Sequence, residues 1–355
     1  MEKDKTMNQK MIGYAVLGLG IGMAHADAAY ASPNATLVAV CDIDETRLQR
    51  AVEKYENVTA YTDFEALLAD QRVEVISICL PSAMHAEYAV RAMEAGKHVL
   101  IEKPIDITPD RAALIEEARI RTGMKAGIVH QNRFNVNMPP IREALDSGRM
   151  GQLFLGTFGV KWYREQSYYD NGGWRGTWEM DGGGSLMNQA VHTVDLMQWL
   201  MGDVVSVTST MGIYNHDIKT EDMTASLIRF KSGAAATFVS TTCAFPGIST
   251  EICLYGTGGS IEADADTIKV WKMKDAPDEE TEENEMLALY GNGNLGVMIR
   301  DPQRLLGHAY VVEDMILAVR DDRDPAVMPA TAIKSVAIVD AIYRSARKGE
   351  TVFLN

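Results

Sequence analysis

The chain has 355 residues, of which 46% are hydrophobic and 23% charged, and this length and composition predict two globular domains, each with its own core. Its net charge of -15 opposes binding to nucleic acid or to an anionic membrane and favours a small neutral substrate. No stretch approaches the ~18 continuous apolar residues of a membrane span. The polar residues 1–10 precede a glycine-broken apolar run that reads as a strand, not as a signal-peptide core, so we expect a cytoplasmic protein.

Short apolar runs alternate with helical segments from residue 11 to residue 133, which predicts a Rossmann domain with a parallel sheet. The first strand is YAVLGLG with its turn, and further strands are expected at residues 37–42, 73–80, 98–104 and 125–130. Helices are expected at residues 45–55 and 85–95, between those strands.

The pattern changes in residues 134–355, where longer alternating segments predict a large, mostly antiparallel open sheet and therefore an α/β domain of α+β type. Its strands are expected at residues 152–163, 204–214, 225–230 and 234–242, and its helices at 140–146, 185–201 and 330–348. We interpret the glycine and aromatic stretch 167–185 as a cleft loop and the acidic segment 275–285 as a solvated loop. For the C-terminal helix, packing on the first domain is an alternative to packing within the second.

Four cysteines, Cys41, Cys79, Cys243 and Cys253, lie in apolar or strand-like runs without the CxxC spacing of a metal or redox site. This pattern predicts buried free thiols in a reducing compartment and no metal.

A glycine-rich turn follows the first strand. Gly18, Gly20 and Gly22, with Ile21 between the last two, leave backbone able to approach a pyrophosphate at a helix N-terminus. The GxGxG spacing is one residue tighter than the usual GxGxxG fingerprint, so the turn alone has a purely structural alternative.

Asp42 ends the second strand about twenty residues after the glycines, where a carboxylate accepts the ribose hydroxyls of adenosine. The alternatives are a solvated strand end or a helix cap shared with Asp44. Because Ile43, not a basic residue, follows Asp42, a 2′-phosphate would meet an uncompensated negative charge. The sequence therefore favours NAD over NADP.

The segment ICLPSAMHAEYAVRAMEAGKHVLIEKPIDIT strongly resembles the Gfo/Idh/MocA family of glucose-fructose oxidoreductase, inositol dehydrogenase and related enzymes. The matching features are Pro81, His85, the run 95–99 and the EKP at 102–104. The resemblance continues through HQNRF (130–134), GGGSLMNQAVHTVDLMQWLMG (182–202) and the C-terminal AIVDAIYRSARKGETVFL, so it covers nearly the whole chain. It implies a Rossmann domain followed by an α/β domain whose open sheet often serves as an oligomer interface, and hence a homodimer or homotetramer.

Two features depart from the family pattern. One is the shortened glycine loop. The other is Asn188, which stands where sugar and cyclitol dehydrogenases of the family often carry an aspartate four residues before the histidine. The second departure concerns the chemistry of the site.

Oxidation of a secondary alcohol needs a base for the hydroxyl proton while hydride leaves for nicotinamide. The resemblance makes Lys103 and His192 the candidates. We expect partial desolvation beyond the strand to lower the pKa of Lys103, and helical spacing to place Asn188, His192 and Asp195 on one face. Which of Lys103 and His192 is the principal base stays open, and each has a structural alternative as a turn or core residue.

The remaining site predictions follow from position in the matched motifs. Expected cofactor contacts are Gly18, Gly20, Ile21, Gly22, Asp42, Pro81, Ser82, His85, Glu102, Lys103 and Gln131. Expected substrate contacts are Asn188, Arg133, Trp174, Arg175 and Tyr163, because aromatic rings and guanidinium groups suit sugar faces and hydroxyls. For Glu102 a structural salt bridge is an equal alternative, and for His85 and the aromatic residues so is packing.

Together these features predict an NAD-dependent dehydrogenase that oxidises a secondary hydroxyl of a sugar, glycoside or cyclitol. One alternative is an enzyme that retains and recycles NAD while it cleaves a glycoside by oxidation and elimination. Another is a non-catalytic regulator that senses dinucleotide or sugar.

Overall fold

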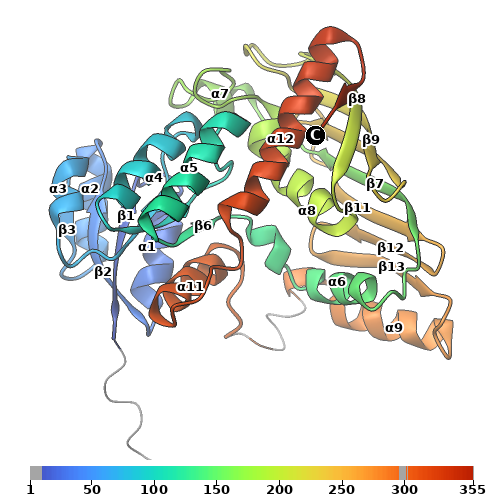
Figure 1. The fold of residues 1–355 in the computed structure, drawn as a ribbon, viewed down its shortest axis with the longest axis horizontal. Helices are drawn as coiled ribbons and strands as arrows, with labels where there is room; N and C mark the ends of the chain where they lie inside the picture. The colour runs from blue at the N-terminus through green and yellow to red at the C-terminus, as the bar shows by residue number, and fades with distance from the viewer. Residues whose placement is uncertain (1–9, 296–300, 302, 355) are drawn as a thin grey trace, which may run out of the picture. The chain divides into compact units, whose positions relative to one another are not determined.

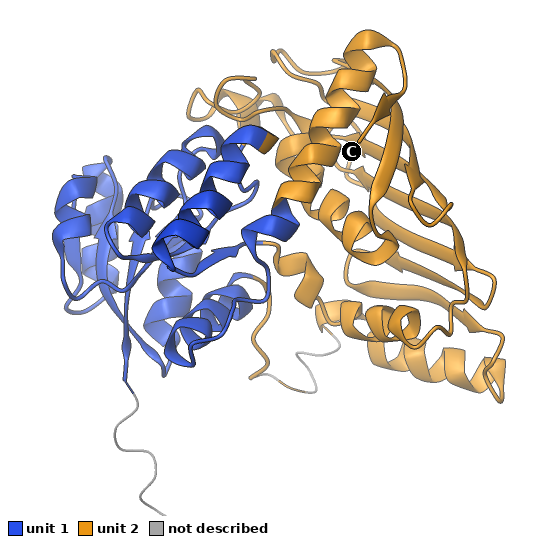
Figure 2. Cartoon of the chain, in the orientation of Figure 1, with its two compact units in different colours: residues 1–106, 110–129, 308–332 blue, residues 107–109, 130–307, 333–355 orange. Residues whose placement is uncertain are grey.

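The computed structural model describes residues 10–295, 301 and 303–354, so most of the polar N-terminal segment lies outside the described residues. The chain forms two compact units (Figure 2). Unit 1 comprises residues 1–106, 110–129 and 308–332, and unit 2 comprises residues 107–109, 130–307 and 333–355. Unit 1 therefore includes a segment from the last fifty residues of the chain in addition to the N-terminal part.

Unit 1 is built on a six-stranded parallel sheet (Figure 1) with the order β3-β2-β1-β4-β5-β6. Its strands are β1 (Ile12–Leu17), β2 (Ala35–Cys41), β3 (Thr59–Tyr61), β4 (Val75–Ile78), β5 (His98–Ile101) and β6 (Ala126–Ile128). Its helices are α1 (Gly22–Ala31), α2 (Glu45–Lys54), α3 (Phe64–Ala69), α4 (His85–Glu94), α5 (Pro109–Thr122) and α11 (Gly307–Arg320), with a 3-10 turn η1 at Ser82–Met84. This confirms the predicted Rossmann fold.

The strand order reverses between β1 and β4, and ligands bind in doubly wound sheets outside the carboxyl ends of strands at such a point. β1 and β4 are buried along their whole length, as expected for strands covered on both faces. The glycine turn after β1 is thereby placed at the binding edge of the sheet.

Unit 2 contains an eight-stranded sheet with the order β13-β12-β11-β7-β10-β9-β8-β14. Only β7 and β10 pair in parallel, and the other neighbours are antiparallel, which confirms the predicted mostly antiparallel sheet. The strands are β7 (Leu153–Lys161), β8 (Val204–Gly212), β9 (Met223–Phe230), β10 (Ala235–Thr241), β11 (Ser249–Gly256), β12 (Gly259–Asp264), β13 (Thr267–Met273) and β14 (Val352–Phe353).

The helical elements that remain are η2 (Gln131–Phe134), α6 (Met138–Asp146), α7 (Gln166–Asp170), the π-helix η3 (Ser185–Ala190), α8 (Val191–Met201), α9 (Glu279–Tyr290) and α12 (Pro329–Lys348). The helix expected at 185–201 is thus two elements, because its first six residues form a π-helical turn. Such turns are rare and are often found at functional sites.

Residues 275–278 of the acidic segment form a loop as predicted, but residues 279–285 are the start of α9, so the prediction is wrong for that part. The Asp278 side chain caps the helix by accepting from the backbone N–H groups of Glu280 and Thr281. Glutamates in the first turn are favourable beside the positive end of the helix dipole, and Arg149 pairs with Glu282 at 2.9 Å. No residue of α9 is fully buried, but its half-buried residues lie on one side, at Glu282, Glu283, Met286, Leu287 and Tyr290, and the helix packs against β13.

All four cysteines are free thiols, and Cys41 and Cys79 are buried, while Cys243 and Cys253 are half-buried. Among the described residues, none of the helices has the length and apolar content needed to cross a bilayer.

Candidate active site

The three glycines of the first turn have three different environments. A Cβ on Gly18, which has a φ of 89°, would meet the Cys79 carbonyl oxygen at 2.5 Å, and one on Gly22 would meet the Val16 side chain at 2.8 Å. A Cβ on Gly20 would meet nothing within 4 Å. Gly18 therefore allows the tight turn and Gly22 the close packing of α1 on the sheet, while Gly20 faces open space. One residue fewer in the loop preserves all three functions.

The N-terminus of α1 suits a phosphate because no side chain caps it. Its N-cap residue, Ile21, is exposed and makes no side-chain hydrogen bond to the helix. The first N–H groups of α1 and the positive end of its dipole thus provide donors for an anion. Together with the bare backbone at Gly20, this arrangement fits the pyrophosphate of a dinucleotide.

Asp42 lies at the end of β2 and joins it to the glycine loop. Its carboxylate accepts from the backbone N–H of Leu19 at 2.6 Å and of Asp44 at 2.9 Å. Asp44 alone caps α2, so the shared-cap alternative for Asp42 does not hold. Arg47 reaches Asp42 at 3.5 Å and Asp44 at 3.4 Å. The expectation that the charge of Asp42 is uncompensated is therefore corrected, although Arg47 is shared between two carboxylates.

Three further predicted cofactor residues follow β4 in unit 1. Pro81 precedes η1, and Ser82 begins it and is buried. The buried ring of His85 bonds the carbonyl oxygen of Leu80 at 2.8 Å through Nε2 and that of Pro104 at 2.7 Å through Nδ1. His85 thereby ties the residues after β4 to the residues after β5, which places it as a support of the Lys103–Pro104 turn.

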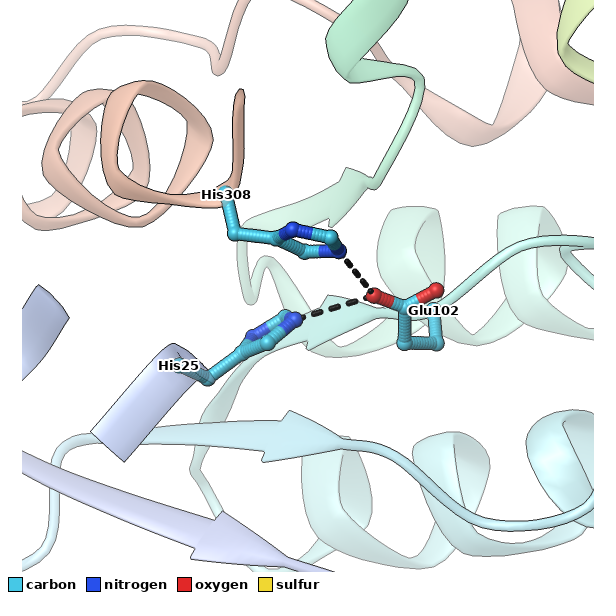
Figure 3. A group of neighbouring side chains, drawn as sticks. All are labelled: His25, Glu102 and His308. Atoms are coloured by element: carbon cyan, nitrogen blue, oxygen red, sulfur yellow. Dashed lines mark hydrogen bonds and ion pairs between the residues drawn. The ribbon is translucent and has the colours of Figure 1, made fainter. Parts of the chain in front are cut away.

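Glu102 and Lys103 follow β5 directly. The Oε1 atom of Glu102 bonds His25 at 3.0 Å and His308 at 3.1 Å (Figure 3), and its Oε2 atom accepts from the Lys103 backbone N–H at 3.0 Å. Burial by itself would raise the pKa of Glu102, but the hydrogen bonds from the two histidines outweigh it and hold that pKa well below its ordinary value. The carboxylate thus fixes the backbone at half-buried Lys103.

In unit 2 the glycine run 182–184 sets the start of the helix that carries His192. A Cβ on Gly183 would meet the Tyr343 hydroxyl at 2.0 Å, and one on Gly184 the Glu221 carbonyl oxygen at 1.9 Å. The Glu221 carboxylate accepts from the N–H groups of Gly184 at 3.0 Å and Leu186 at 2.8 Å. Burial raises the pKa of Glu221 to about 7. The sequence needs glycine here because only bare backbone fits against these two partners.

Asn188 lies in the π-helical turn and is 8% exposed. Its Nδ2 atom donates to Asp181 Oδ1 at 2.5 Å, and its Oδ1 atom accepts from Gln189 Nε2 at 2.7 Å and from the Tyr168 hydroxyl at 3.3 Å. Asp181 also accepts from the Gly176 N–H at 2.9 Å and is 1% exposed. A carboxylate therefore stands directly behind the amide that replaces the usual aspartate.

His192 is the second residue of α8 and is half-buried. Its ring contacts that of His130 edge-to-face, with 5.7 Å between centroids. His130 Nε2 lies 3.7 Å from the Asp195 carboxylate, which also accepts from Ser335 at 3.1 Å. Burial acts to raise the pKa of Asp195, but His130 and Arg133 lower it below its ordinary value.

Arg133, a predicted substrate contact, already forms an ion pair inside unit 2, and its contact with substrate stays a prediction. Its Nε and Nη2 atoms make a bidentate pair with Asp195 at 2.7 and 2.6 Å, and the side chain is 7% exposed. Its guanidinium also stacks on Trp199 at 5.5 Å. The geometry assigns Arg133 to holding α8, because its strongest donors are already used inside the unit.

Of the other predicted substrate residues, Trp174 and Arg175 lie near Tyr168, whereas Tyr163 lies beside Phe245. Trp174 stacks with Arg175 at 4.7 Å, and Arg175 lies over the Tyr168 ring at 5.0 Å. Tyr163 instead contacts Phe245 edge-to-face at 5.1 Å, and its hydroxyl donates to Glu165 at 3.4 Å.

Gln131 begins η2 in unit 2, and its Oε1 atom is buried with no hydrogen-bond partner among the described residues. A buried amide oxygen without a donor suits an N–H group of a ligand.

Several functional neighbours were not singled out from the sequence: His25, His130, Arg164, Asp181, Gln189, Glu221 and His308. Asp181 directly precedes the three consecutive glycines, so its position next to this motif could have identified it from the sequence. His25 and His308 are 283 residues apart, and only the folded structure brings them together.

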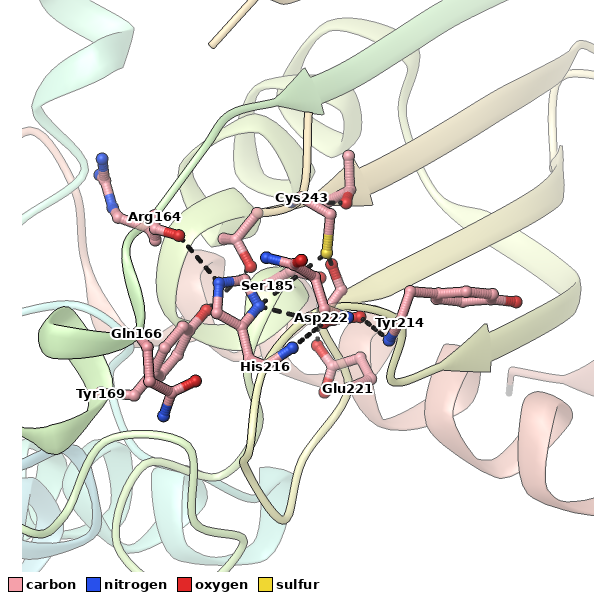
Figure 4. Close-up of polar contacts among 12 residues, drawn as sticks. Arg164, Gln166, Tyr169, Ser185, Tyr214, His216, Glu221, Asp222 and Cys243 are labelled. Atoms are coloured by element: carbon pink, nitrogen blue, oxygen red, sulfur yellow. Dashed lines mark hydrogen bonds and ion pairs between the residues drawn. The ribbon is translucent and has the colours of Figure 1, made fainter. Parts of the chain in front are cut away.

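Two side-chain groups contain donor types that bind metals, namely His25–Glu102–His308 and His216–Asp222–Cys243 (Figure 4). In the second group His216 Nδ1 bonds Asp222 at 3.0 Å, and burial raises the pKa of the Cys243 thiol to about 11. Thiolate is the form that binds metal, so a raised pKa disfavours that use. The absence of a metal stays a prediction.

Comparison with known proteins gives two family matches. Residues 12–128 match the profile described as "Oxidoreductase family, NAD-binding Rossmann fold", and residues 140–262 match "GFO/IDH/MocA C-terminal domain". The D-glucoside 3-dehydrogenase of Escherichia coli is 29% identical over 55% of this chain, which spans only 56% of that enzyme's length. The myo-inositol 2-dehydrogenase of Thermotoga maritima is 28% identical over 70% of this chain and 74% of its own.

Among solved structures, the WlbA dehydrogenase of Bordetella pertussis in complex with NADH and UDP-GlcNAcA is similar along the whole chain. It is 28% identical with a TM-score of 0.88, and the alignment covers 98% of this chain and 99% of WlbA.

Proposed function

Because the chain belongs to the Gfo/Idh/MocA family of NAD-binding oxidoreductases, we propose that it is a dehydrogenase that oxidises a secondary hydroxyl of a sugar, glycoside or cyclitol. The observation that carries the proposal is the phosphate cradle at Gly20 and α1 together with Lys103, which both lie beyond carboxyl ends of strands in one sheet. The expected substrate class rests on the relatives, which include enzymes named for a D-glucoside and myo-inositol and one bound to UDP-GlcNAcA.

The cofactor is NAD, which when bound accepts hydride at nicotinamide C4. On this proposal Gly18, Gly20, Ile21 and Gly22 hold the pyrophosphate by backbone N–H groups, and Asp42 accepts the adenosine ribose hydroxyls. Pro81 and Ser82 line the path between them, while His85 and Glu102 support the turn that carries Lys103. Gln131 offers its buried amide oxygen to the ligand.

Lys103 and His192 share the acid–base role in this proposal. A base takes the proton of the substrate hydroxyl as the C–H bond breaks, and it returns that proton in the reverse direction. His192 stands next to His130, which leads to the Asp195 carboxylate, so a positive charge on this pair is compensated. Asn188 orients the substrate hydroxyl, and Asp181 behind it supplies the negative charge that aspartate supplies in other members of the family.

The two alternative functions, a glycoside-cleaving enzyme and a regulator, differ from a dehydrogenase in how they use the nucleotide. An enzyme that cleaves glycosides by oxidation and elimination would retain its nucleotide and return it to the oxidised state in each cycle. A regulator would bind dinucleotide without turnover.

The test is a panel of sugars, glycosides and cyclitols with NAD, followed by NADH absorbance, with mass spectrometry of any nucleotide that copurifies. Stoichiometric NADH for each hydroxyl oxidised supports the dehydrogenase. Product without net NADH favours the recycling enzyme. Bound nucleotide without any product favours the regulator, and a chain that binds neither NAD nor NADH contradicts the proposal.

We also propose that the chain is a cytoplasmic homo-oligomer. Leu155 on β7 and Leu227 on β9 are 37% and 48% exposed on the same outer face of the eight-stranded sheet. Apolar side chains on an open sheet face favour self-association. Light scattering of the eluted protein tests this, because a monomer at micromolar concentration contradicts it.

A further inference from the structure

Two arginines of unit 2 hold their guanidinium groups against one tyrosine ring. Arg164 lies 5.3 Å and Arg175 5.0 Å from the centroid of Tyr168. Each also stacks on a tryptophan, Arg164 on Trp162 at 5.2 Å and Arg175 on Trp174 at 4.7 Å. Cation–π contacts fix a guanidinium by its face and leave its N–H edge for a planar acceptor. We call these five residues the arginine–aromatic cluster.

Neither arginine of the cluster forms an ion pair with a carboxylate anywhere in the described part of the chain. The acceptors near Arg164 are neutral, namely Gln189 Oε1 at 2.8 Å and the Tyr163 carbonyl oxygen at 3.5 Å. Arg175 donates to the Asn171 carbonyl oxygen at 3.4 Å, and its Nε atom is buried without a hydrogen-bond partner. Two positive charges therefore have only neutral acceptors, in a chain whose net charge is -15.

The backbone at Arg164 is held on both sides (Figure 4). Its N–H donates to the Thr242 carbonyl oxygen at 2.9 Å, and its own carbonyl oxygen accepts from His216 Nε2 at 2.8 Å. His216 is in turn bonded to the buried carboxylate of Asp222 at 3.0 Å. This arrangement fixes the position of the guanidinium before any ligand arrives, which lowers the ordering cost of binding.

The cluster is joined to the candidate substrate residues. Gln189 accepts from Arg164 and donates to the Tyr168 hydroxyl at 2.8 Å and to Asn188 at 2.7 Å. Asn188 in η3 lies four residues before His192 in α8, so the cluster and the proposed acid–base group are connected through these two consecutive helical elements.

We propose that the arginine–aromatic cluster binds an anionic group of the substrate, a carboxylate or a phosphate, so that the enzyme acts on an acidic sugar and not on a neutral one. This inference rests on the proposed function and specifies its substrate class. Carboxylate and phosphate are the acceptors that match the planar donors of arginine. The net charge predicted a neutral substrate, but the local charge of the cluster outweighs that distant field at contact distance because surface charges are screened beyond about 10 Å.

The test measures binding, so that it does not depend on turnover. The full chain with saturating NADH is titrated calorimetrically with methyl β-D-glucuronide, with methyl β-D-glucoside and with glucose 6-phosphate. The first two differ only in a carboxylate against a hydroxymethyl group. We expect at least one of the two anionic sugars to bind roughly tenfold or more tightly than the glucoside, because charge-assisted bonds exceed neutral ones. Preference for the glucuronide assigns a carboxylate, and preference for the phosphate ester assigns a phosphate.

Arg175→Gln should abolish that preference, because it weakens binding of the anionic sugar far more than binding of the glucoside. The matched control is Arg347→Gln, which removes the same charge from an arginine stacked on Trp178 at 4.4 Å and should leave the preference intact. Equal binding of all three sugars by the wild type overturns the inference, as does an equal loss for all three in Arg175→Gln. The wild-type comparison stands even when a variant fails to fold. Selective binding without NADH formation from any sugar would instead contradict the proposed function and leave this inference standing.

Discussion

The proposed cofactor region of unit 1 offers mainly backbone groups to a ligand, whereas the proposed substrate region of unit 2 offers mainly side chains. The glycine turn and α1 offer backbone N–H groups, helped by one carboxylate, Asp42. The region around Asn188 and His192 consists of buried and half-buried side chains from separate segments. Asn188 bonds Asp181 and Gln189, and Gln189 bonds Tyr168 and Arg164. A site made of backbone groups tolerates changes of side chain. In a buried polar network, removing one side chain leaves its hydrogen-bond partner unsatisfied.

The largest expected effect is the loss of turnover in Lys103→Met, which distinguishes a role in proton transfer from a role in nucleotide binding. Lys103→Met should lower kcat/KM for sugar oxidation by about a thousandfold, within the range of a lost acid–base group, because the substrate hydroxyl then loses the Lys103 amine. NADH affinity, read by its fluorescence, should change far less, since backbone groups hold the nucleotide. An equal loss in both quantities would show that Lys103 serves binding instead of proton transfer.

A glycine-to-alanine substitution, made once in each region, separates a stability effect from a binding effect. Gly184→Ala should destabilise unit 2 by about 3 kcal/mol, because its Cβ would meet the Glu221 carbonyl oxygen at 1.9 Å. Gly20→Ala is the matched control, since its Cβ meets nothing within 4 Å; it should leave the melting temperature nearly unchanged and weaken NADH binding. The reverse pattern in thermal unfolding would contradict both assignments.

Glu221 gives a pH dependence with a defined sign. Burial raises its pKa to about 7, so the folded protein binds a proton more tightly than the unfolded chain, whose glutamates titrate near 4.3. Stability from this group is therefore full below about pH 4 and lost as pH rises through 7, by roughly 3–4 kcal/mol.

The measurement is urea unfolding from pH 4 to pH 8 for the wild type and Glu221→Gln, whose side chain does not titrate. The difference in unfolding free energy, wild type minus variant, should fall with rising pH. A difference that stays constant or grows with pH would show that Glu221 is ionised throughout, held by the N–H groups of Gly184 and Leu186.

The smallest expected effect concerns the choice of nucleotide. Asp42→Ser removes the carboxylate that faces Arg47 at 3.5 Å and leaves that guanidinium paired with Asp44 alone. NAD affinity should fall about tenfold and NADP affinity should rise, because a 2′-phosphate no longer meets the Asp42 charge. Unchanged preference in paired NADH and NADPH titrations would mean that Asp42 serves only the Leu19 N–H.

The two regions also differ in how far the sequence predicts them. The first was predictable because strand, glycines and Asp42 lie within thirty residues and each has a local backbone reason. The second was predicted only as a set of motifs. Arg133 showed the limit, because its pairing with Asp195 requires knowing that segments 62 residues apart meet. Asp181 bonds Asn188 through a loop whose path the hydrophobic periodicity of the sequence does not reveal. The acidic α9 was missed because Asp278 and Arg149 stabilise a helix whose inner side is only half-buried and carries few apolar residues.

The central claim is that a hydride passes from a sugar carbon to NAD within this site. The direct measurement uses a substrate found in the sugar panel, deuterated at the oxidised carbon, with mass spectrometry of the nucleotide formed. The account predicts NADH heavier by one mass unit in proportion to product, with both formed about a thousandfold more slowly by the Lys103→Met protein. Product formed with unlabelled nucleotide would contradict it.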